Sequence, residues 1–187
     1  KRRVHNSLLE PEEQSGIEGG VDLLFGSRFG LHVTRFDQLA FGLIQTVTKV
    51  DSSGGLMGPP RYWYQLQNVG EISNRGWEMQ GSAALGGLTV TGALSTVDSR
   101  VRRLANRYTG DLRTTDRMLG VPARTLAGTI SWLRRGFHVS STLSRAWDWT
   151  NYDRLRIAQC YVAGCPDAKS LSGQTLRNYW AHYDGST

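Results

Sequence analysis

The chain has 187 residues, the length of one ordinary domain, and 39% of them are apolar, with a mean hydropathy of −0.38. No apolar run approaches the roughly 18 residues that a membrane helix needs. This excludes a spanning helix but not a membrane β-barrel, because a barrel strand presents only every second residue to lipid. Taken alone, the composition favours a soluble all-β protein that is rich in turns.

The net charge is +6 and the pI is about 9.7, and most of the positive charge comes from arginine. The arginines lie mainly in the segments that separate the expected strands. No zinc-ligand spacing, recognition helix or aromatic RNA-binding motif accompanies them, so we expect no nucleic-acid partner.

Alternation of apolar and polar residues predicts seven β-strands. In chain order they cover about residues 13–25, 29–47, 62–85, 88–99, 121–133 and 137–150, and a last strand starts near Gln174. The alternation in the second strand becomes irregular after Val33, which indicates a bulge or a strand that leaves the membrane. The third strand is too long to be straight, and we expect a bulge at residues 73–76.

The most regular alternation forms a hairpin around the tight turn at residues 85–87. Before the turn, one face carries Trp77 and Met79 and the other carries Glu78 and Gln80. After the turn, the alternation resumes from Leu88. Two strands of about ten residues with one apolar face are typical of a transmembrane β-hairpin, whose polar face lines a wet lumen.

The connections between strands alternate in length. Short turns at residues 26–30, 85–87 and 134–136 alternate with long loops at 48–61, 99–121 and 150–173. Outer-membrane barrels have short periplasmic turns and long extracellular loops. We therefore expect an antiparallel up-and-down meander of about seven strands, part of a larger transmembrane β-barrel and an open, curved sheet in this chain.

Three segments occur in a distinctive order: LEPEEQSGIEGGVDLLF (residues 9–25), YQLQNVGEISNRGWEMQGSAAL (residues 64–85) and YTGDLRTTDRMLGVPARTLAGTISWL (residues 108–133). Together they resemble the barrel of TonB-dependent outer-membrane receptors. The resemblance implies that residues 1–187 are part of the C-terminal half of such a barrel domain. It also implies that the plug domain and the remaining strands lie outside this chain.

What this family does supplies further expectations. The resemblance implies a protein of the bacterial outer membrane that imports a scarce nutrient such as an iron-siderophore complex. Its partners would be outer-membrane lipid and lipopolysaccharide, its own plug domain, TonB through that plug, and the extracellular nutrient. In this family the extracellular loops and the upper lumen contact the ligand. The loop candidates, whose arginine and tyrosine side chains suit an anionic or catecholate ligand, are Arg100, Arg102, Arg103, Arg107, Tyr108, Tyr152 and Arg154.

We expect no enzymatic activity, cofactor or metal site, and no catalytic residue. The four histidines are scattered, and the sequence contains no nucleophile elbow, HExxH or phosphate-binding glycine loop. An outer-membrane enzyme would need a Ser/His or Asp/His pair at a barrel rim, and no convincing pair is visible in the sequence.

The two cysteines, Cys160 and Cys165, lie five residues apart in a predicted loop. In an oxidising compartment they can close a small disulfide. A free pair is the second interpretation. A metal site is the third, because no other cysteine or histidine lies within ten residues to complete it.

A soluble secreted all-β binding module, such as a carbohydrate-binding sandwich, is the alternative to the barrel. The two differ in where the apolar faces point: outward on one continuous surface in a barrel, against a second sheet in a sandwich. The diagnostic residues are Trp77, Met79, Leu88, Val90, Ile130 and Val139.

Overall fold

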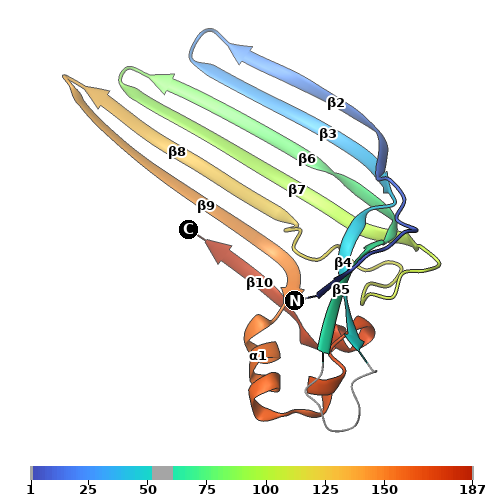
Figure 1. Cartoon of the computed structure of the whole chain (residues 1–187). Coiled ribbons are helices and arrows are strands. Elements are labelled where there is room, and N and C mark those ends of the chain that lie inside the picture. Colours follow the sequence, from blue (N-terminus) through green and yellow to red (C-terminus); the bar gives the residue numbers. More distant parts are fainter. Residues whose placement is uncertain (1, 52–60, 187) are drawn as a thin grey trace.

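The structure is a computed structural model that describes residues 2–51 and 61–186. Its main sheet has seven strands in the spatial order β10-β9-β8-β7-β6-β3-β2, and every neighbouring pair is antiparallel. Their bounds are β2 (Glu13–Phe25), β3 (Phe29–Phe41), β6 (Gly70–Leu85), β7 (Leu88–Leu104), β8 (Arg124–Arg134), β9 (Phe137–Tyr152) and β10 (Trp180–Ser186). The described part of the sheet is curved and stays open at β2 and β10 (Figure 1). The predicted antiparallel meander of about seven strands is confirmed.

A second, three-stranded sheet lies at the end of the main sheet where long loops connect β7 to β8 and β9 to β10, which we call the loop end. The hairpin of β4 (Ile44–Asp51) and β5 (Arg61–Asn68) leaves the main sheet between β3 and β6, and β1 (Arg2–Val4) pairs parallel with β5. The tight turns that join β2 to β3, β6 to β7 and β8 to β9 all lie at the opposite end of the sheet (Figure 1).

Two glycines explain why the predicted strands at 29–47 and 62–85 are each divided in two. Gly42 and Gly70 have φ angles of +65° and +130°, which side chains disfavour, and the Gly42 N–H donates to the Gly70 carbonyl over 2.9 Å. Both strands therefore bend at the same level. The predicted bulge at 73–76 is wrong, because the register shift between β6 and β7 lies between Glu71 and Ile72.

The predicted start of the last strand near Gln174 is also wrong. Residues Gly173–Tyr179 form the 3-10 helix η2, and β10 begins only at Trp180. The preceding loop contains α1 (Arg154–Ala163) and the short 3-10 helix η1 (Pro166–Lys169). The side chain of Asp153 caps α1 by accepting a hydrogen bond from the Arg156 N–H over 2.9 Å.

Within the described ranges, both clusters of buried apolar residues lie at the loop end of the main sheet. One core cluster contains Val69, Ile72, Val101, Leu112 and Met118, and a second contains Cys160, Ala168, Leu171 and Tyr179. By contrast, every residue of β2 is exposed. Over most of its length the sheet is therefore a single layer among the described residues, with both faces open.

One face of this layer is apolar. The six diagnostic residues are all between 37% and 61% exposed. The strand register makes their face continuous, because Val90 lies opposite Ile130 and Leu88 lies opposite Trp132, which in turn lies opposite Val139. Within the described ranges no second sheet covers this face. The barrel interpretation requires such an uncovered face, whereas a sandwich would bury it against a second sheet.

No helix in the described part of the chain is both long and apolar enough to cross a membrane.

Candidate functional site

Two long loops at the same end of the sheet are tied together, and they contain three of the seven predicted ligand residues, Arg107, Tyr108 and Arg154. The β7–β8 loop spans residues 105–123 and the β9–β10 loop spans residues 153–179. Arg177 donates to both carboxylate oxygens of Asp116, and its Nη2 lies 2.7 Å from Oδ1. The Arg113 Nε donates to the side chain of Gln174 over 2.9 Å. These contacts hold the two loops as one unit.

Asp111 lies at the centre of this unit and is only 4% exposed. Its Oδ2 accepts hydrogen bonds from the Tyr152 hydroxyl and from the Trp180 indole N–H, each over 2.7 Å. Its backbone carbonyl accepts from Arg177 over 3.2 Å. A buried carboxylate is stabilised by such donors, so Asp111 fixes the positions of Tyr152 and Trp180.

A cavity of about 340 Å³ opens between this unit and the β4–β5 hairpin. Three of the predicted ligand residues, Tyr108, Tyr152 and Arg154, line it together with Asp111. Its other walls include Thr46, Thr48, Tyr64, Ile157 and Leu176. Phenol, guanidinium and apolar groups thus share one enclosed space at the loop end.

The hydroxyls of Tyr108 and Tyr152 in this cavity stay protonated at neutral pH. Burial is the main cause that raises the pKa of Tyr108 to about 12. Burial, and then the charge and hydrogen bond of Asp111, raise the pKa of Tyr152, which lies at the loop end of β9 beyond the apolar band. The Tyr108 hydroxyl can therefore act as a hydrogen-bond donor to an anionic ligand, whereas the single proton of the Tyr152 hydroxyl is donated to Asp111.

A second cavity, of about 740 Å³, holds two more of the predicted residues, Arg103 and Arg107. The Arg103 Nη2 lies 3.6 Å from Oε2 of Glu71, which also lines this cavity. Buried Gln67 lines it too and accepts the backbone N–H of Thr109 over 2.9 Å, so it anchors the start of the β7–β8 loop.

The remaining two candidates lie elsewhere. Arg100 donates from Nε to Asp98 over 2.8 Å, and both side chains are about half exposed. Arg102 is exposed and lines neither cavity. The predicted arginine group therefore does not converge: two members share the larger cavity and two lie outside both.

Sequence reasoning overlooked Asp111, Arg177 and Trp180 as parts of the site. Arg177 lies 61 residues after its partner Asp116, and Trp180 lies 69 residues after Asp111. No local pattern marks pairs so far apart. The only available signal was the mixture of aspartates with arginines in the β7–β8 loop.

Cys160 and Cys165 lie at the end of α1, next to the second core cluster. Their Cα atoms are 4.9 Å apart, within the range a disulfide requires, and the structure joins them. The Tyr179 hydroxyl lies 3.1 Å from the Cys160 sulfur. The pair thus ties the end of α1 to the loop that leads to η1.

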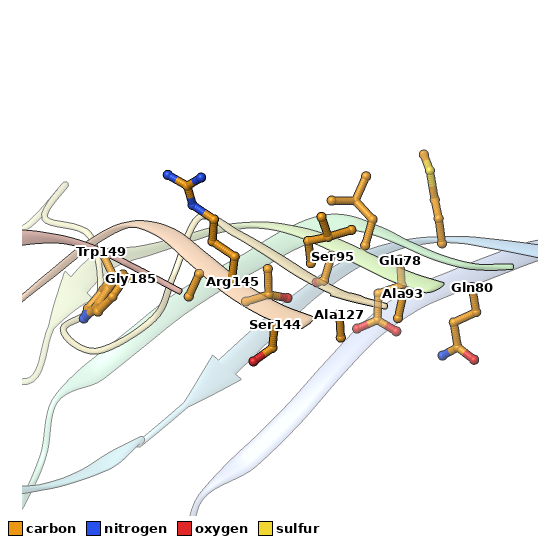
Figure 2. A pocket seen from close by; sticks show the side chains of 14 residues that line it. Glu78, Gln80, Ala93, Ser95, Ala127, Ser144, Arg145, Trp149 and Gly185 are labelled. Atoms are coloured by element: carbon orange, nitrogen blue, oxygen red, sulfur yellow. The ribbon is translucent and has the colours of Figure 1, made fainter. Parts of the chain in front are cut away.

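The face opposite the apolar one is polar. Glu78, Gln80, Ser95 and Ser144 line a trough of about 550 Å³ across β6–β9, and apolar side chains such as Ala93, Ala127 and Trp149 complete its lining. Figure 2 shows Gln80 and Ser144 beneath the arched sheet and Arg145 on the other side. This is the arrangement of a barrel wall, with a wet inner face and an apolar outer face.

One group on the polar face has the composition of a hydrolase triad. The His32 Nδ1 lies 2.7 Å from Asp22, and its Nε2 lies 2.7 Å from the Thr34 hydroxyl. Thr34 is only 5% exposed, however, so its hydroxyl is not presented to a substrate. The group lies in the strands rather than at the loop rim. No cluster of three metal-ligating side chains occurs in the described ranges.

Comparison with known proteins adds to this geometry. One protein-family model, described as "TonB dependent receptor-like, beta-barrel", matches residues 2–180. The chain belongs to this family. This family match confirms the resemblance seen in the sequence. A sequence search of curated proteins finds no match.

Solved structures support the same fold. The "Copper transporter OprC" is 13% identical with a TM-score of 0.55, and the match covers 76% of this chain and 20% of that one. The siderophore receptor PirA from Acinetobacter baumannii is 14% identical with a TM-score of 0.56, and the match covers 96% of this chain and 25% of that one. The chain thus spans a fifth to a quarter of the length of these proteins.

Proposed function

We propose that the chain is a section of a TonB-dependent transporter of the bacterial outer membrane. In this proposal residues 1–187 belong to the barrel domain, which imports a scarce nutrient such as an iron-siderophore complex without covalent chemistry. The observation that carries the proposal is the single-layered sheet with one exposed apolar face in a chain of this family.

The two tied loops would contact the ligand on the extracellular side. In the smaller cavity Tyr108 offers a neutral donor and Arg154 a cation, and Tyr152, whose hydroxyl donates to Asp111, forms part of the wall. Arg103 and Arg107 add positive charge in the larger one. Guanidinium and phenol groups suit carboxylate, catecholate or hydroxamate oxygens, which are the donors of iron chelators. PirA is described as a siderophore receptor, and its similar fold is consistent with this ligand class.

The polar trough would face the plug domain. Its small and polar side chains include Glu78, Gln80 and Ser144, which can exchange hydrogen bonds with water or with a plug that moves. Energy for this movement would reach the plug from TonB, as the family membership implies. The tight turns would lie on the periplasmic side and the long loops outside the cell.

Uptake by the complete receptor tests the proposal. The gene that contains this chain is deleted and restored, and import of ⁵⁵Fe-loaded siderophores is measured under iron limitation. We expect uptake to be lost on deletion and restored by the intact gene. Unchanged uptake of every iron chelator and of copper would contradict the proposed class of transported nutrient.

Variants of the intact receptor then test the ligand site. Tyr108→Phe combined with Arg154→Gln should lower ligand affinity about tenfold or more, since one hydrogen bond to a charged group contributes about 1.5–3 kcal/mol. Arg102→Gln is the matched control, because it removes the same charge outside both cavities. If the double variant and Arg102→Gln bind the ligand with equal affinity, the smaller cavity is not the ligand site.

A further inference from the structure

The strand register places arginine and tryptophan in a single row across five strands of the outer face. Arg35 lies opposite Trp77, Trp77 opposite Thr96, Thr96 opposite Arg124 and Arg124 opposite Trp147. The next row toward the tight turns is Val33, Met79, Leu94, Leu126 and Arg145. The arginine–tryptophan row, which we define as Arg35, Trp77, Arg124 and Trp147, therefore borders the apolar band on its loop side.

Two arginines on this border are exposed and have no acidic partner among the described residues. Arg124 lies directly opposite Trp147, and the Arg145 guanidinium lies 4.9 Å from the centroid of the same ring. The Arg145 side chain lies on the opposite side of the sheet from Gln80 and Ser144 (Figure 2). The Trp147 indole therefore has one cation stacked on its ring and a second arginine as its cross-strand neighbour on the outer face.

The neighbouring row toward the loops balances its own charges. Arg75 lies opposite Asp37 on one side and Asp98 on the other, and Arg100 donates to Asp98 over 2.8 Å. Farther along, Arg117 pairs with Asp148 over 3.0 Å. Positive charge without a carboxylate partner among the described residues therefore remains on Arg124 and Arg145, at the boundary between the apolar band and this row.

We propose that Arg124 and Arg145, with Trp147 between them, bind a phosphate group of lipid A in the outer leaflet. The inference rests on the proposed membrane location. An apolar band places acyl chains beside Val90 and Ile130, so the layer just above it meets the headgroups. Guanidinium groups recognise phosphate by charge-assisted hydrogen bonds, and an indole ring prefers this interfacial depth.

Lipid binding by the complete receptor tests the site. The receptor that carries this segment is purified in detergent and titrated with diphosphoryl lipid A, and separately with lipid A stripped of both phosphates. Native mass spectrometry counts the bound lipid. We expect Arg124→Gln with Arg145→Gln to weaken binding of the diphosphoryl form by about 25-fold, from about fivefold for each arginine at an anionic surface.

Arg134→Gln is the matched control, because Arg134 lies opposite Phe137 beside the tight turn at the other end of the sheet. It should bind lipid A like the wild type. The double replacement Arg124→Lys with Arg145→Lys keeps both charges and should retain at least about half of the wild-type binding. If the glutamine variant fails to fold, the lysine variant and the phosphate-free lipid still decide the result.

Three outcomes would overturn the site: equal binding by the wild type and the glutamine variant, equal binding of both lipids by the wild type, or loss of binding in Arg134→Gln instead. Membrane fractionation and iron uptake are measured on the same strains. If the receptor is absent from the outer membrane, the proposed function is contradicted. If the receptor transports iron but binds both forms of lipid A equally, only the lipid site is contradicted.

Discussion

Arg177 of η2 and Asp116 of the β7–β8 loop form a two-pronged ion pair between loops that are 61 residues apart in sequence. Their side chains are only 27% and 12% exposed, so water screens the pair weakly. The pair joins the structural units that carry Tyr108 and Arg154. The shape of the smaller cavity therefore depends on a contact that involves none of the proposed ligand-binding groups.

Asp116→Asn should loosen the joined loops in the complete receptor. Loss of a two-pronged charged contact costs about 2 kcal/mol, so trypsin should cleave after Arg113 or Arg117 about 30-fold faster. Asp98→Asn is the control, because it breaks a pair whose side chains are 47% and 46% exposed and which contributes little. Equal cleavage rates for the two variants would show that the buried pair does not hold the loops.

The same pair makes the loops sensitive to acid. Burial alone would raise the pKa of Asp116, but the hydrogen bonds from Arg177 and the Arg113 backbone outweigh it and lower the pKa below the ordinary aspartate value. The stabilisation is therefore complete above the unfolded-state pKa of about 4 and is lost as the pH falls through the lower folded-state pKa. Hydrogen exchange of residues 109–118, corrected for intrinsic rates, should accelerate below about pH 4. The Asp116→Asn variant should exchange faster already at neutral pH. If its exchange rates depend on pH as those of the wild type do, the ion pair is not the cause.

Two adjacent residues of β8 test which face meets lipid. Ile130 is 55% exposed on the apolar face, whereas Thr129 hydrogen-bonds Thr142 on the opposite face over 2.9 Å. Ile130→Arg should cost about 2–4 kcal/mol and reduce the assembled receptor, because arginine is costly in the bilayer interior. Thr129→Arg should assemble close to wild-type level. Heat-modifiable migration on gels measures assembly, and the opposite ranking would reverse the assignment of the faces.

Gly70 should tolerate no side chain. Its φ of +130° is unfavourable for other residues, and a Cβ there would overlap the Arg103 carbonyl oxygen. We expect Gly70→Ala to prevent correct pairing of β6 with β7 and to reduce assembled receptor severalfold. Gly86→Ala is the control, because Gly86 also has positive φ (+59°) but has open space around it, so only about 1 kcal/mol should be lost. Similar assembly of both variants would show that the close approach at Gly70 is unimportant.

Cys160 and Cys165 should be paired in receptor isolated from cells. The intact mass should then be about 2 Da lower than that of the reduced protein, and iodoacetamide should modify the cysteines only after reduction. In the loop-entropy description a disulfide this short contributes about 2 kcal/mol, so reduction should make α1 more sensitive to protease. Alkylation of both cysteines without reduction would leave the free pair as the correct interpretation.

Sequence by itself determined the class of this protein. Alternation with a period of two marks a strand because successive side chains point to opposite faces. This local rule located six of the seven strands of the main sheet and placed the start of the seventh six residues too early. The same rule correctly assigned Trp77, Val90 and Ile130 to one exposed face. The alternation of short turns with long loops, and the three family segments, needed no knowledge of distant contacts.

Tertiary structure alone decided the boundaries and the site. The paired bends at Gly42 and Gly70 are stabilised by a hydrogen bond across the hairpin, so neither half of the sequence shows why the strands are divided there. The helix α1 escaped prediction because it lacks an apolar stripe: Leu155 and Val162 are both exposed. The meeting of Asp111 with Tyr152 and Trp180 depends on how two loops fold over the sheet, and periodicity carries no information about contacts 41 and 69 residues apart.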